Sequence, residues 1–164
     1  MPHIARDRGK RRRQSSVSVA REYTGDTLSP EERSERMSRI RGKDTKPELT
    51  IRRLVHGMGY RYRLHRNDLP GKPDMVFAGR RKVIFMHGCF WHRHPDPNCA
   101  LARLPKSKLD FWRTKLEHNR ERDLREQAQL RKLGWAYLII WECQLRDLES
   151  VSARISEFLE GTNG

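Results

Sequence analysis

The residues best suited to chemistry gather in one stretch of the chain, Val83–His94. Its first four residues are apolar and predict a buried strand, and ligand-type side chains follow directly after them. Such side chains at the end of a buried strand are typical of an active site or a metal site. Two interpretations are open: a structural zinc loop with two aromatic residues packed beneath it, or a catalytic site. The ligand-type residues are His87, Cys89, His92 and His94.

All three cysteines of the chain, together with one histidine, suit a closed tetrahedral zinc site. The spacing is not that of a standard zinc finger, and His92 or His87 could replace His94 as a ligand. The alternative is three unrelated buried cysteines, but the histidines crowded between two of the cysteines favour zinc. The expected ligands are Cys89, His94, Cys99 and Cys143.

A carboxylate ahead of the same strand suggests a second metal site. Asp74 follows Pro73 at the start of a predicted hairpin, so it would lie across from the end of the second strand, beside Met86 and His87. A carboxylate next to a strand-end backbone carbonyl, here that of Met86, is a hard-oxygen site that Mg²⁺ accepts. Proline followed by aspartate is also ordinary turn chemistry, so both interpretations stay open.

Other polar residues could take part in the same site. Glu48 occupies the third position of a capping box, where a structural glutamate belongs. Asp123 and Asn119 fall in the middle of the apolar stripe of a long helix, and polar groups on an inward face must be paired or functional. One of the neighbouring arginines could pair with Asp123. His92, beyond two aromatic residues, could take a proton from water.

Two capping boxes predict helices near the start of the chain. Ser29-Pro30-Glu31-Glu32 begins a short helix to about Ile40, and Thr45-Lys46-Pro47-Glu48 begins one to about Met58. In the second helix, apolar residues recur at i, i+3, i+4 and i+7 from Ile51, so one face packs on a core. Tyr60–Leu64 alternates strictly and predicts a half-exposed strand.

The rest of the chain predicts a sheet flanked by helices. Met75–Ala78 and Lys82–Met86 form a predicted hairpin, Ser107–Leu133 the longest helix and Trp135–Trp141 a central strand covered on both faces. This order gives a right-handed crossover onto a mixed sheet. The predicted fold class is α/β, with one mixed central β-sheet flanked by helices. The longest helix has the apolar stripe Leu109, Trp112, Leu116 and Leu130. A closing helix is marked by Val151, Ile155, Phe158 and Leu159.

Charge indicates the class of partner. The 164 residues include 35 Lys and Arg against 21 Asp and Glu, a formal net charge of +14. Residues 1–27 hold seven basic and three acidic residues, a net +4, which leaves +10 for residues 28–164. Such an excess points to a polyanion, although a ribosomal or other structural basic protein would show the same sum. We expect residues 1–27 to form a disordered basic arm and residues 28–164 a single domain.

Cysteine use and hydropathy bear on the cellular compartment. Three cysteines, an odd number, without a secretory hydrophobic segment at the start argue against a disulfide framework and for a reducing compartment. No run of residues reaches membrane-spanning length. We therefore expect a soluble intracellular protein.

Four segments stand out by their order and spacing. They are Pro70-Gly71-Lys72-Pro73-Asp74, His87-Gly88-Cys89-Phe90-Trp91-His92, Asn119-Arg120-Glu121-Arg122-Asp123 and Gly134-Trp135 through Trp141-Glu142-Cys143. Together they resemble the very short patch repair endonucleases of bacteria, DNA mismatch nicking enzymes with a restriction-endonuclease-like core. The resemblance covers about Ser34 to Cys143. It implies a cytoplasmic, nucleoid-associated monomer that acts on double-stranded DNA with a T·G mismatch, alongside repair proteins.

The resemblance also implies roles for individual residues. Asp74 resembles the Mg²⁺-binding aspartate of the family, beside the backbone carbonyl of Met86, and His92 resembles the histidine that activates the attacking water. Supporting active-site positions match Glu48, His87 and Asp123. The structural zinc ligands match Cys89, His94, Cys99 and Cys143. Residues that insert into the DNA stack match Phe90 and Trp91, with Met37 of the first helix in the other groove.

The chain departs from the family pattern in two places. Met86 stands where a family member has threonine, although the role there belongs to the backbone carbonyl. The loop from His94 to Cys99 is longer than in that member. The second acid and the lysine of the general restriction-endonuclease core are absent from the end of the second hairpin strand, where Met86 and His87 stand instead.

The leading hypothesis is a Mg²⁺-dependent, zinc-stabilised endonuclease that nicks one DNA strand at a T·G mismatch. The alternatives are a site-specific restriction-type nuclease on matched DNA and a non-catalytic zinc-stabilised DNA-binding module. A pure binding module has no reason to set Asp74, Asp123 and Glu48 against a phosphate, which they repel. A nuclease needs such acids to hold cations.

Overall fold

The computed structural model of the chain describes residues 29, 35 and 44–161. The arm predicted for residues 1–27 and Met37 lie outside the described residues, as does the helix predicted from Ser29 to Ile40 apart from Ser29 and Glu35. No helix in the described ranges is both long enough and apolar enough to cross a membrane.

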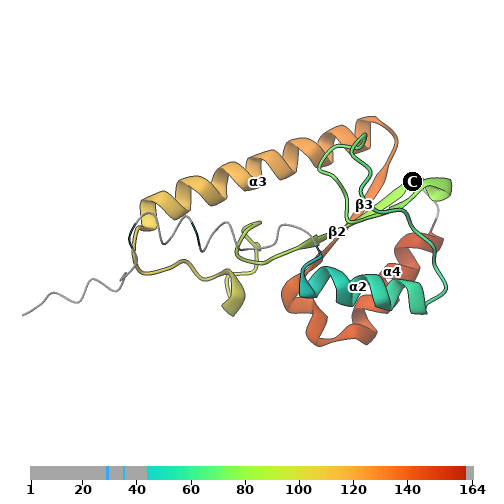
Figure 1. Ribbon diagram of the computed structural model, residues 1–164, viewed down its shortest axis with the longest axis horizontal. Coiled ribbons are helices and arrows are strands. Elements are labelled where there is room, and N and C mark those ends of the chain that lie inside the picture. Colours follow the sequence, from blue (N-terminus) through green and yellow to red (C-terminus); the bar gives the residue numbers. More distant parts are fainter. Residues whose placement is uncertain (1–28, 30–34, 36–43, 162–164) are drawn as a thin grey trace, which may run out of the picture.

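A three-stranded mixed sheet forms the centre of the described structure (Figure 1). Its strands are β1 (Met75–Phe77), β2 (Lys82–His87) and β3 (Ala136–Trp141). β1 pairs antiparallel with β2, and β2 pairs parallel with β3. A parallel pair needs a crossover connection, which a long helix between β2 and β3 supplies. The predicted α/β class with a mixed central sheet is confirmed.

Three helices cover the two faces of this sheet. α2 (Lys46–Gly57) begins at the predicted N-cap Thr45, whose hydroxyl accepts a hydrogen bond from Glu48 N. α3 (Leu109–Lys132) connects β2 to β3, and α4 (Leu148–Glu160) follows β3. Figure 1 shows α3 on one side of the sheet and α2 with α4 on the other.

The central strand is β2 rather than β3. All six residues of β2 are buried, as expected for a strand covered on both faces. The prediction that Trp135–Trp141 is central was wrong, because β3 pairs only with β2 among the described residues and is mostly half-buried. Its apolar run instead reflects the helices on its two faces, since both α3 and α4 contact β3.

The strand predicted for Tyr60–Leu64 is reduced to a single bridge. Arg63 exchanges two backbone hydrogen bonds of 2.9 Å with Val76 of β1, and no further pair follows in the described part of the chain. β1 has only three residues, so its outer edge offers one such pair. The predicted alternation holds nevertheless: Arg61 and Arg63 are exposed, and the other three side chains are half-buried.

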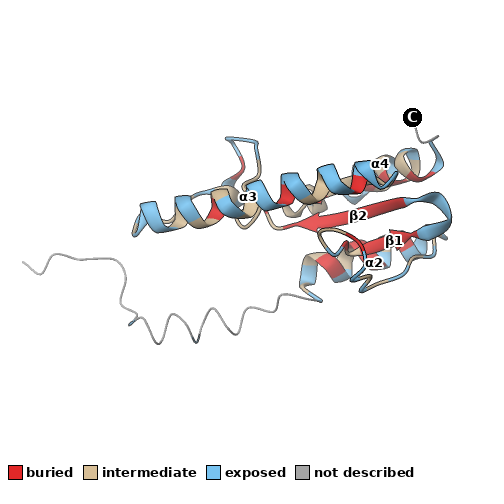
Figure 2. Ribbon diagram, turned by 90° about the horizontal axis from the view of Figure 1, so that it is seen from above, coloured by how far each residue is buried: buried red, intermediate tan, exposed pale blue. Residues whose placement is uncertain are grey.

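Alternation along the strands divides the apolar side chains between two cores. One core lies between the sheet and helices α2 and α4, and the other lies between the sheet and α3. Figure 2 shows β1 and β2 in the colour of buried residues. Polar side chains can therefore gather only at the strand ends. The first core contains Ile51, Val55, Met75, Phe77, Ile84, Met86, Ile140, Val151, Ile155 and Leu159. The second contains Leu69, Val76, Val83, Phe85 and Leu130.

The apolar stripe predicted on α3 is confirmed only in part. Leu116 and Leu130 are fully buried, whereas Leu109 is 38% exposed. The first turns of α3 extend beyond the sheet (Figure 1), so they have no strand to pack against. Asp123 lies in the buried stripe, as predicted, and Asn119 is half-buried beside it.

Candidate active site

Asp74 lies beside the end of β2, as the predicted hairpin requires. The register pairs Met75 with Ile84, which places Asp74 next to the last residues of β2. Its Oδ2 accepts a hydrogen bond of 2.7 Å from Met86 N. The carboxylate is therefore fixed at the end of β2, beside Met86.

A cavity of about 280 Å³ opens beside this carboxylate. Its walls come from α2, from residues 65–73, from the end of β2 and from the turn after β2. Four residues that the sequence singled out meet there, although they are spread over 45 positions of the chain. They are Glu48, Asp74, His87 and His92.

The surroundings of Asp74 make it a weaker acid than usual. Burial raises the pKa of the Asp74 carboxyl from 3.8 to about 6, and the negative charge of Glu48 adds to the rise. The hydrogen bond from Met86 and the positive charges of Arg52 and His92 act in the opposite direction. A divalent cation would relieve the mutual repulsion of these carboxylates, so the donor set fits Mg²⁺.

His92 and Asp123 form a hydrogen-bonded pair at the edge of the cavity. His92 Nδ1 lies 2.6 Å from Asp123 Oδ2, and Arg122 Nη2 donates to the other oxygen at 3.2 Å. Burial raises the pKa of Asp123, but the hydrogen bonds from His92 and Arg122 and the charges of His92 and His87 together lower it below its ordinary value, so the carboxyl is ionised at neutral pH. An ionised partner at Nδ1 keeps a proton on that nitrogen and leaves Nε2 as an acceptor.

His87 lies directly against His92. The two rings stack with centroids 3.9 Å apart and planes 15° from parallel. Burial and the charge of His92 lower the pKa of His87 to about 3, so its ring is neutral at pH 7. His87 Nδ1 is buried without a hydrogen-bond partner in the described structure. A buried polar atom without a partner costs free energy. A group bound in the cavity could supply the missing hydrogen-bond partner of His87.

Glu48 caps α2 and faces the cavity as well. Its Oε1 accepts a hydrogen bond from Thr45 Oγ1 and its Oε2 accepts one from Asp44 N, both at 2.9 Å. Arg52 Nη2 also lies 3.2 Å from Oε2. The capping role considered from the sequence is therefore present, and it is compatible with a place in the site.

Arg52 is a site residue that the sequence reasoning missed. It is only 8% exposed, lines the cavity, and forms ion pairs with Asp44 and Glu48. Its Nε is buried without a partner among the described residues. A buried cation next to Glu48 and Asp74 offsets part of their negative charge. The signal in the sequence is the i, i+4 spacing from Glu48 on a predicted helix.

The loop that leads to Asp74 requires a glycine at position 71. The φ of Gly71 is +75°, and a Cβ there would lie 3.1 Å from the Phe85 ring and 3.2 Å from Glu126 Oε2. Gly71→Ala is expected to lower the free energy of unfolding by about 1–2 kcal/mol in urea titrations, because it adds both backbone strain and crowding. Gly79→Ala, with no atom within 4 Å of its added Cβ, is the control. Equal stability of the two variants would contradict this account of the loop.

The loop after β2 brings the three cysteines of the chain together with one histidine. Their sulfur and ring nitrogen atoms lie within 4.8 Å of one another, and the cysteines are not joined by disulfides. The histidine is His94 rather than His92 or His87, and its Nδ1 is buried without a partner in the described structure. Three thiols and an imidazole at this spacing fit a tetrahedral zinc site. The cluster consists of Cys89, His94, Cys99 and Cys143.

The longer loop between His94 and Cys99 does not displace Cys99 from the cluster. Cys99 N donates to Asp96 O at 3.2 Å, and Asn98 N donates to Asp96 Oδ1 at 2.9 Å. These bonds close the extra residues into a compact turn. The departure from the family pattern noted in the sequence is therefore accommodated locally.

Phe90 and Trp91 are half-buried and pack against Trp112 of α3. The ring centroids lie 5.0 Å apart for Phe90 and Trp91, 5.3 Å for Phe90 and Trp112 and 6.1 Å for Trp91 and Trp112. Asn119 Nδ2 donates to Trp91 O at 3.1 Å, so the inward polar residue predicted on the long helix holds this turn. Lys115 Nζ lies 5.8 Å from the centroids of both tryptophans.

Comparisons with known proteins agree on one family. Residues 25–99 match the family model for the DNA mismatch endonuclease Vsr. The chain is 50% identical over 135 residues to the type II nicking enzyme V.XorIIP of Xanthomonas oryzae pv. oryzae, covering 82% of this chain and 97% of that protein. It is 40% identical over 134 residues to the DNA mismatch endonuclease Vsr of Escherichia coli K12, covering 79% and 84%. It is 36% identical over 134 residues to the type II nicking enzyme V.NmeAIP of Neisseria meningitidis serogroup A, covering 82% and 94%.

Proposed function

The chain belongs to the Vsr family of DNA mismatch endonucleases and is a DNA-nicking phosphodiester hydrolase, and from this premise we propose that it uses Mg²⁺ to nick one strand at T·G mismatches. The observation that carries the assignment to residues is the meeting of Asp74, His87 and the His92–Asp123 pair at the end of β2. The domain is expected to span residues 28–164, to act as a monomer and to have a restriction-endonuclease-like core.

His92 is the general base of the proposed reaction. Because Nδ1 is hydrogen-bonded to Asp123, Nε2 is the nitrogen that takes a proton from the attacking water. The ionised Asp123 stabilises the imidazolium that forms, in the manner of the acid in a catalytic triad. Stacking against the neutral ring of His87 fixes the plane of the His92 ring.

Asp74 and the backbone carbonyl of Met86 would hold the catalytic Mg²⁺. Bound there, Mg²⁺ supplies Lewis-acid stabilisation of the charge that develops on the phosphate oxygens. Above about pH 6 the Asp74 carboxyl is ionised and ready to bind a cation. Arg52 holds Glu48 in place beside it.

Cys89, His94, Cys99 and Cys143 would hold a structural zinc ion. The first three lie in the loop after β2 and the fourth directly after β3, so the ion would tie the turn that carries His92 to the sheet. The role proposed for zinc is to position this turn, with no part in the chemical step.

Phe90 and Trp91 would insert into the base stack at the lesion. Both rings are half-buried and pack against Trp112, which supports them from the protein side. A mismatched base step costs the least free energy to unstack. Met37, which the resemblance places in the opposite groove, lies outside the described residues.

The double variant Phe90→Ala with Trp91→Ala is expected to lose preference for mismatched DNA while melting within a few degrees of wild type. Side chains that serve mainly as a wedge contribute to discrimination more than to folding. Nicking rates on T·G and matched duplexes, together with a thermal melt, measure both quantities. If both rings are core residues, the variant will lose about 3–5 kcal/mol per ring and keep its discrimination.

A strand-specific nicking assay tests the proposed function. Duplexes with a T·G pair and the matched C·G and T·A pairs, labelled on either strand, are incubated with Mg²⁺ or with EDTA. The proposal expects nicking of one strand of the T·G duplex only, and only with Mg²⁺. Equal nicking of a matched sequence would favour site-specific nicking instead, a candidate that the names of the type II nicking relatives support.

A further inference from the structure

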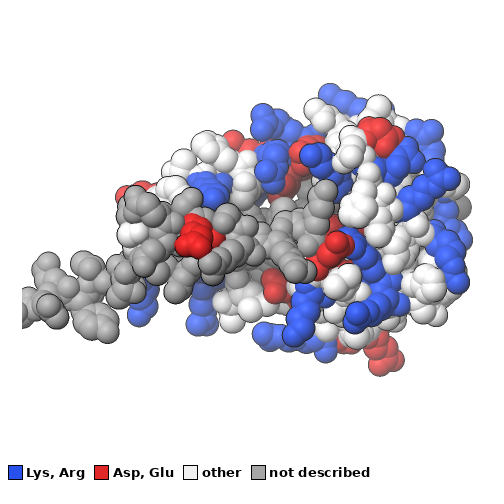
Figure 3. Space-filling model, viewed as in Figure 1, with Lys and Arg blue, Asp and Glu red and all other residues white. Residues whose placement is uncertain are grey.

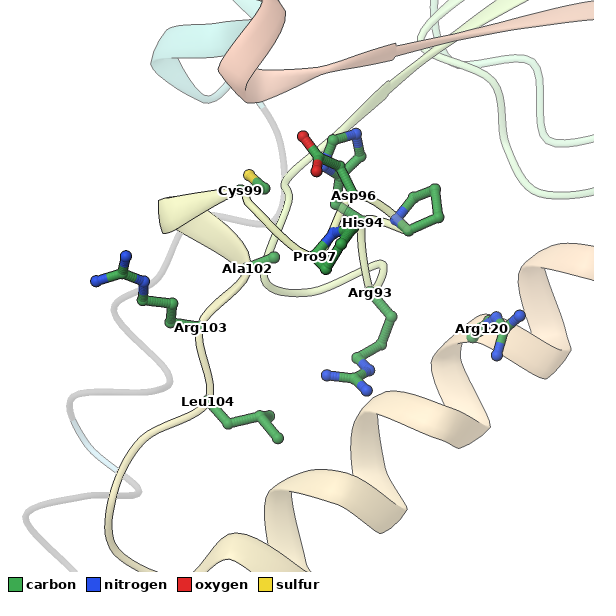
Figure 4. A pocket seen from close by; sticks show the side chains of 10 residues that line it. Arg93, His94, Asp96, Pro97, Cys99, Ala102, Arg103, Leu104 and Arg120 are labelled. Atoms are coloured by element: carbon green, nitrogen blue, oxygen red, sulfur yellow. The ribbon is translucent and has the colours of Figure 1, made fainter.

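A second cavity, of about 700 Å³, lies between the loop after β2 and the middle of α3. It shares no lining residue with the catalytic cavity. Three arginines from separate parts of the chain line it: Arg93 follows the catalytic turn, Arg103 precedes α3 and Arg120 belongs to α3. We call it the arginine cavity. Figure 4 shows Arg93 extending from its loop toward α3, with Leu104 on the segment across from it.

The arginines of this cavity are available to an anion. The guanidinium groups of Arg93 and Arg103 form no hydrogen bond or ion pair with any residue the structure describes. Arg120 has one exposed ion pair, in which its Nη1 lies 3.2 Å from Glu117 Oε1, and such surface pairs contribute little. Asp96 is the one acid among the described lining residues, and its Oδ1 is engaged by Asn98 N. Three guanidinium groups against one carboxylate leave a clear positive excess.

The backbone fixes where Arg93 points relative to the catalytic residue. His92 N donates to Gly88 O at 3.2 Å and His94 N donates to Cys89 O at 3.0 Å, on either side of Arg93. Three consecutive side chains of this turn therefore point to three different places. Trp91 packs against Trp112, His92 lines the cavity beside Asp74, and Arg93 lines the arginine cavity. A DNA strand with its reacting phosphate at His92 must continue past the same turn.

We propose that the arginine cavity binds a backbone phosphate of the DNA substrate close to the nicked position. This inference rests on the DNA-nicking activity but not on the preference for T·G. Guanidinium groups match phosphate oxygens with paired, charge-assisted hydrogen bonds. Lys and Arg side chains are spread widely over the visible face of the molecule (Figure 3), but the arginine cavity adds a hollow into which a phosphate fits. Its contacts position the strand and read no bases.

Salt-dependent binding by two single variants tests the proposal. Arg93→Gln and Arg120→Gln are titrated with a labelled T·G duplex and its matched counterpart over a range of KCl concentrations. Each lost phosphate contact is expected to reduce the slope of log affinity against log salt by about 0.9 on both duplexes. Affinity at low salt should fall about tenfold. In single-turnover nicking, the half-saturating enzyme concentration should rise by more than the maximal rate falls.

Arg53→Gln is the matched control, because it removes the same charge from an exposed position on α2, and its slope should change far less. Arg120 belongs to α3 and not to the loop that carries the proposed zinc ligands, so it tests the proposal even if Arg93→Gln releases zinc. Wild-type slopes for both cavity variants, or an equal change in Arg53→Gln, would overturn the proposal. Loss restricted to the maximal rate would also overturn it, since Arg93 would then act through His92. If the protein shows no preference for T·G, the slopes of the cavity variants and of Arg53→Gln can still be compared on the matched duplex, so failure of the proposed function and failure of this inference are distinguishable.

Discussion

Asp74→Asn is expected to reduce the single-turnover nicking rate by at least about a hundredfold while leaving DNA affinity nearly unchanged. The variant keeps the hydrogen bond from Met86 N, because an amide oxygen can accept it, but it loses the charge that would hold Mg²⁺. DNA affinity is expected to persist because it comes mainly from Lys and Arg contacts to phosphates. Rates are measured with excess enzyme on a strand-labelled T·G duplex, and affinity by titration of the same duplex in EDTA.

His92→Ala should show a loss of similar size, because it removes the base that takes the proton from water. His118→Ala, which removes an exposed histidine from α3, is the control and should nick at the wild-type rate. Near-normal nicking by Asp74→Asn or His92→Ala would exclude that residue from the mechanism.

Asp74→Asn should also stabilise the metal-free protein at neutral pH. The folded pKa of Asp74, about 6, lies above its ordinary value of 3.8. The stability that protonated Asp74 contributes is therefore present below about pH 3.8 and is lost as the pH rises through 6. At pH 7.5 the asparagine variant should exceed wild type by up to about 3 kcal/mol, and the two should converge below pH 4. Urea titrations in EDTA measure this, and a variant less stable than wild type at pH 7.5 would contradict the burial account.

Cys143→Ser is expected to lose zinc and at least about 3 kcal/mol of unfolding free energy together. Cys143 lies more than forty residues beyond Cys99 and directly after β3. A metal ion bound there links the catalytic turn to the last strand, so the free energy of metal binding becomes free energy of folding. Metal content by mass spectrometry and stability in urea are measured on the same preparations.

The variant Cys143→His provides the control for the zinc account. Histidine is also a zinc ligand, so this variant should retain more metal and more stability than Cys143→Ser. One full equivalent of zinc in Cys143→Ser would show that the ligand set is wrong. Loss of stability without loss of metal would point to packing of the thiol rather than to coordination.

The parts of the site that follow from local pattern could be predicted from the sequence. The hairpin placed Asp74 beside Met86, because antiparallel pairing fixes which residues face each other. The helical count placed Asp123 on the buried face of α3, where it meets His92. Thr45 capped α2 where the capping box predicted. In each case, a few neighbouring residues and a fixed period determine the geometry.

The parts that depend on three-dimensional packing could not be predicted in this way. Leu109 matches the stripe of α3, but its exposure depends on where the sheet ends. Tyr60–Leu64 alternates like a strand, yet its pairing is limited by the length of β1. The burial of Arg52 beside the cavity next to Asp74 depends on how α2 packs against the sheet. Periodicity within one segment carries no information about its neighbours in space.

The most direct test of the central claim is a competition between two duplexes in one reaction. A T·G duplex and its matched counterpart, with different labels, are mixed at equal concentration with enzyme and Mg²⁺. The ratio of the two nicking rates then gives the ratio of kcat/KM values directly. The account predicts that the T·G duplex is nicked first and on one strand, and that the Phe90→Ala with Trp91→Ala variant brings the ratio close to one. A wild-type ratio of one would contradict the claim that the chain is a mismatch endonuclease.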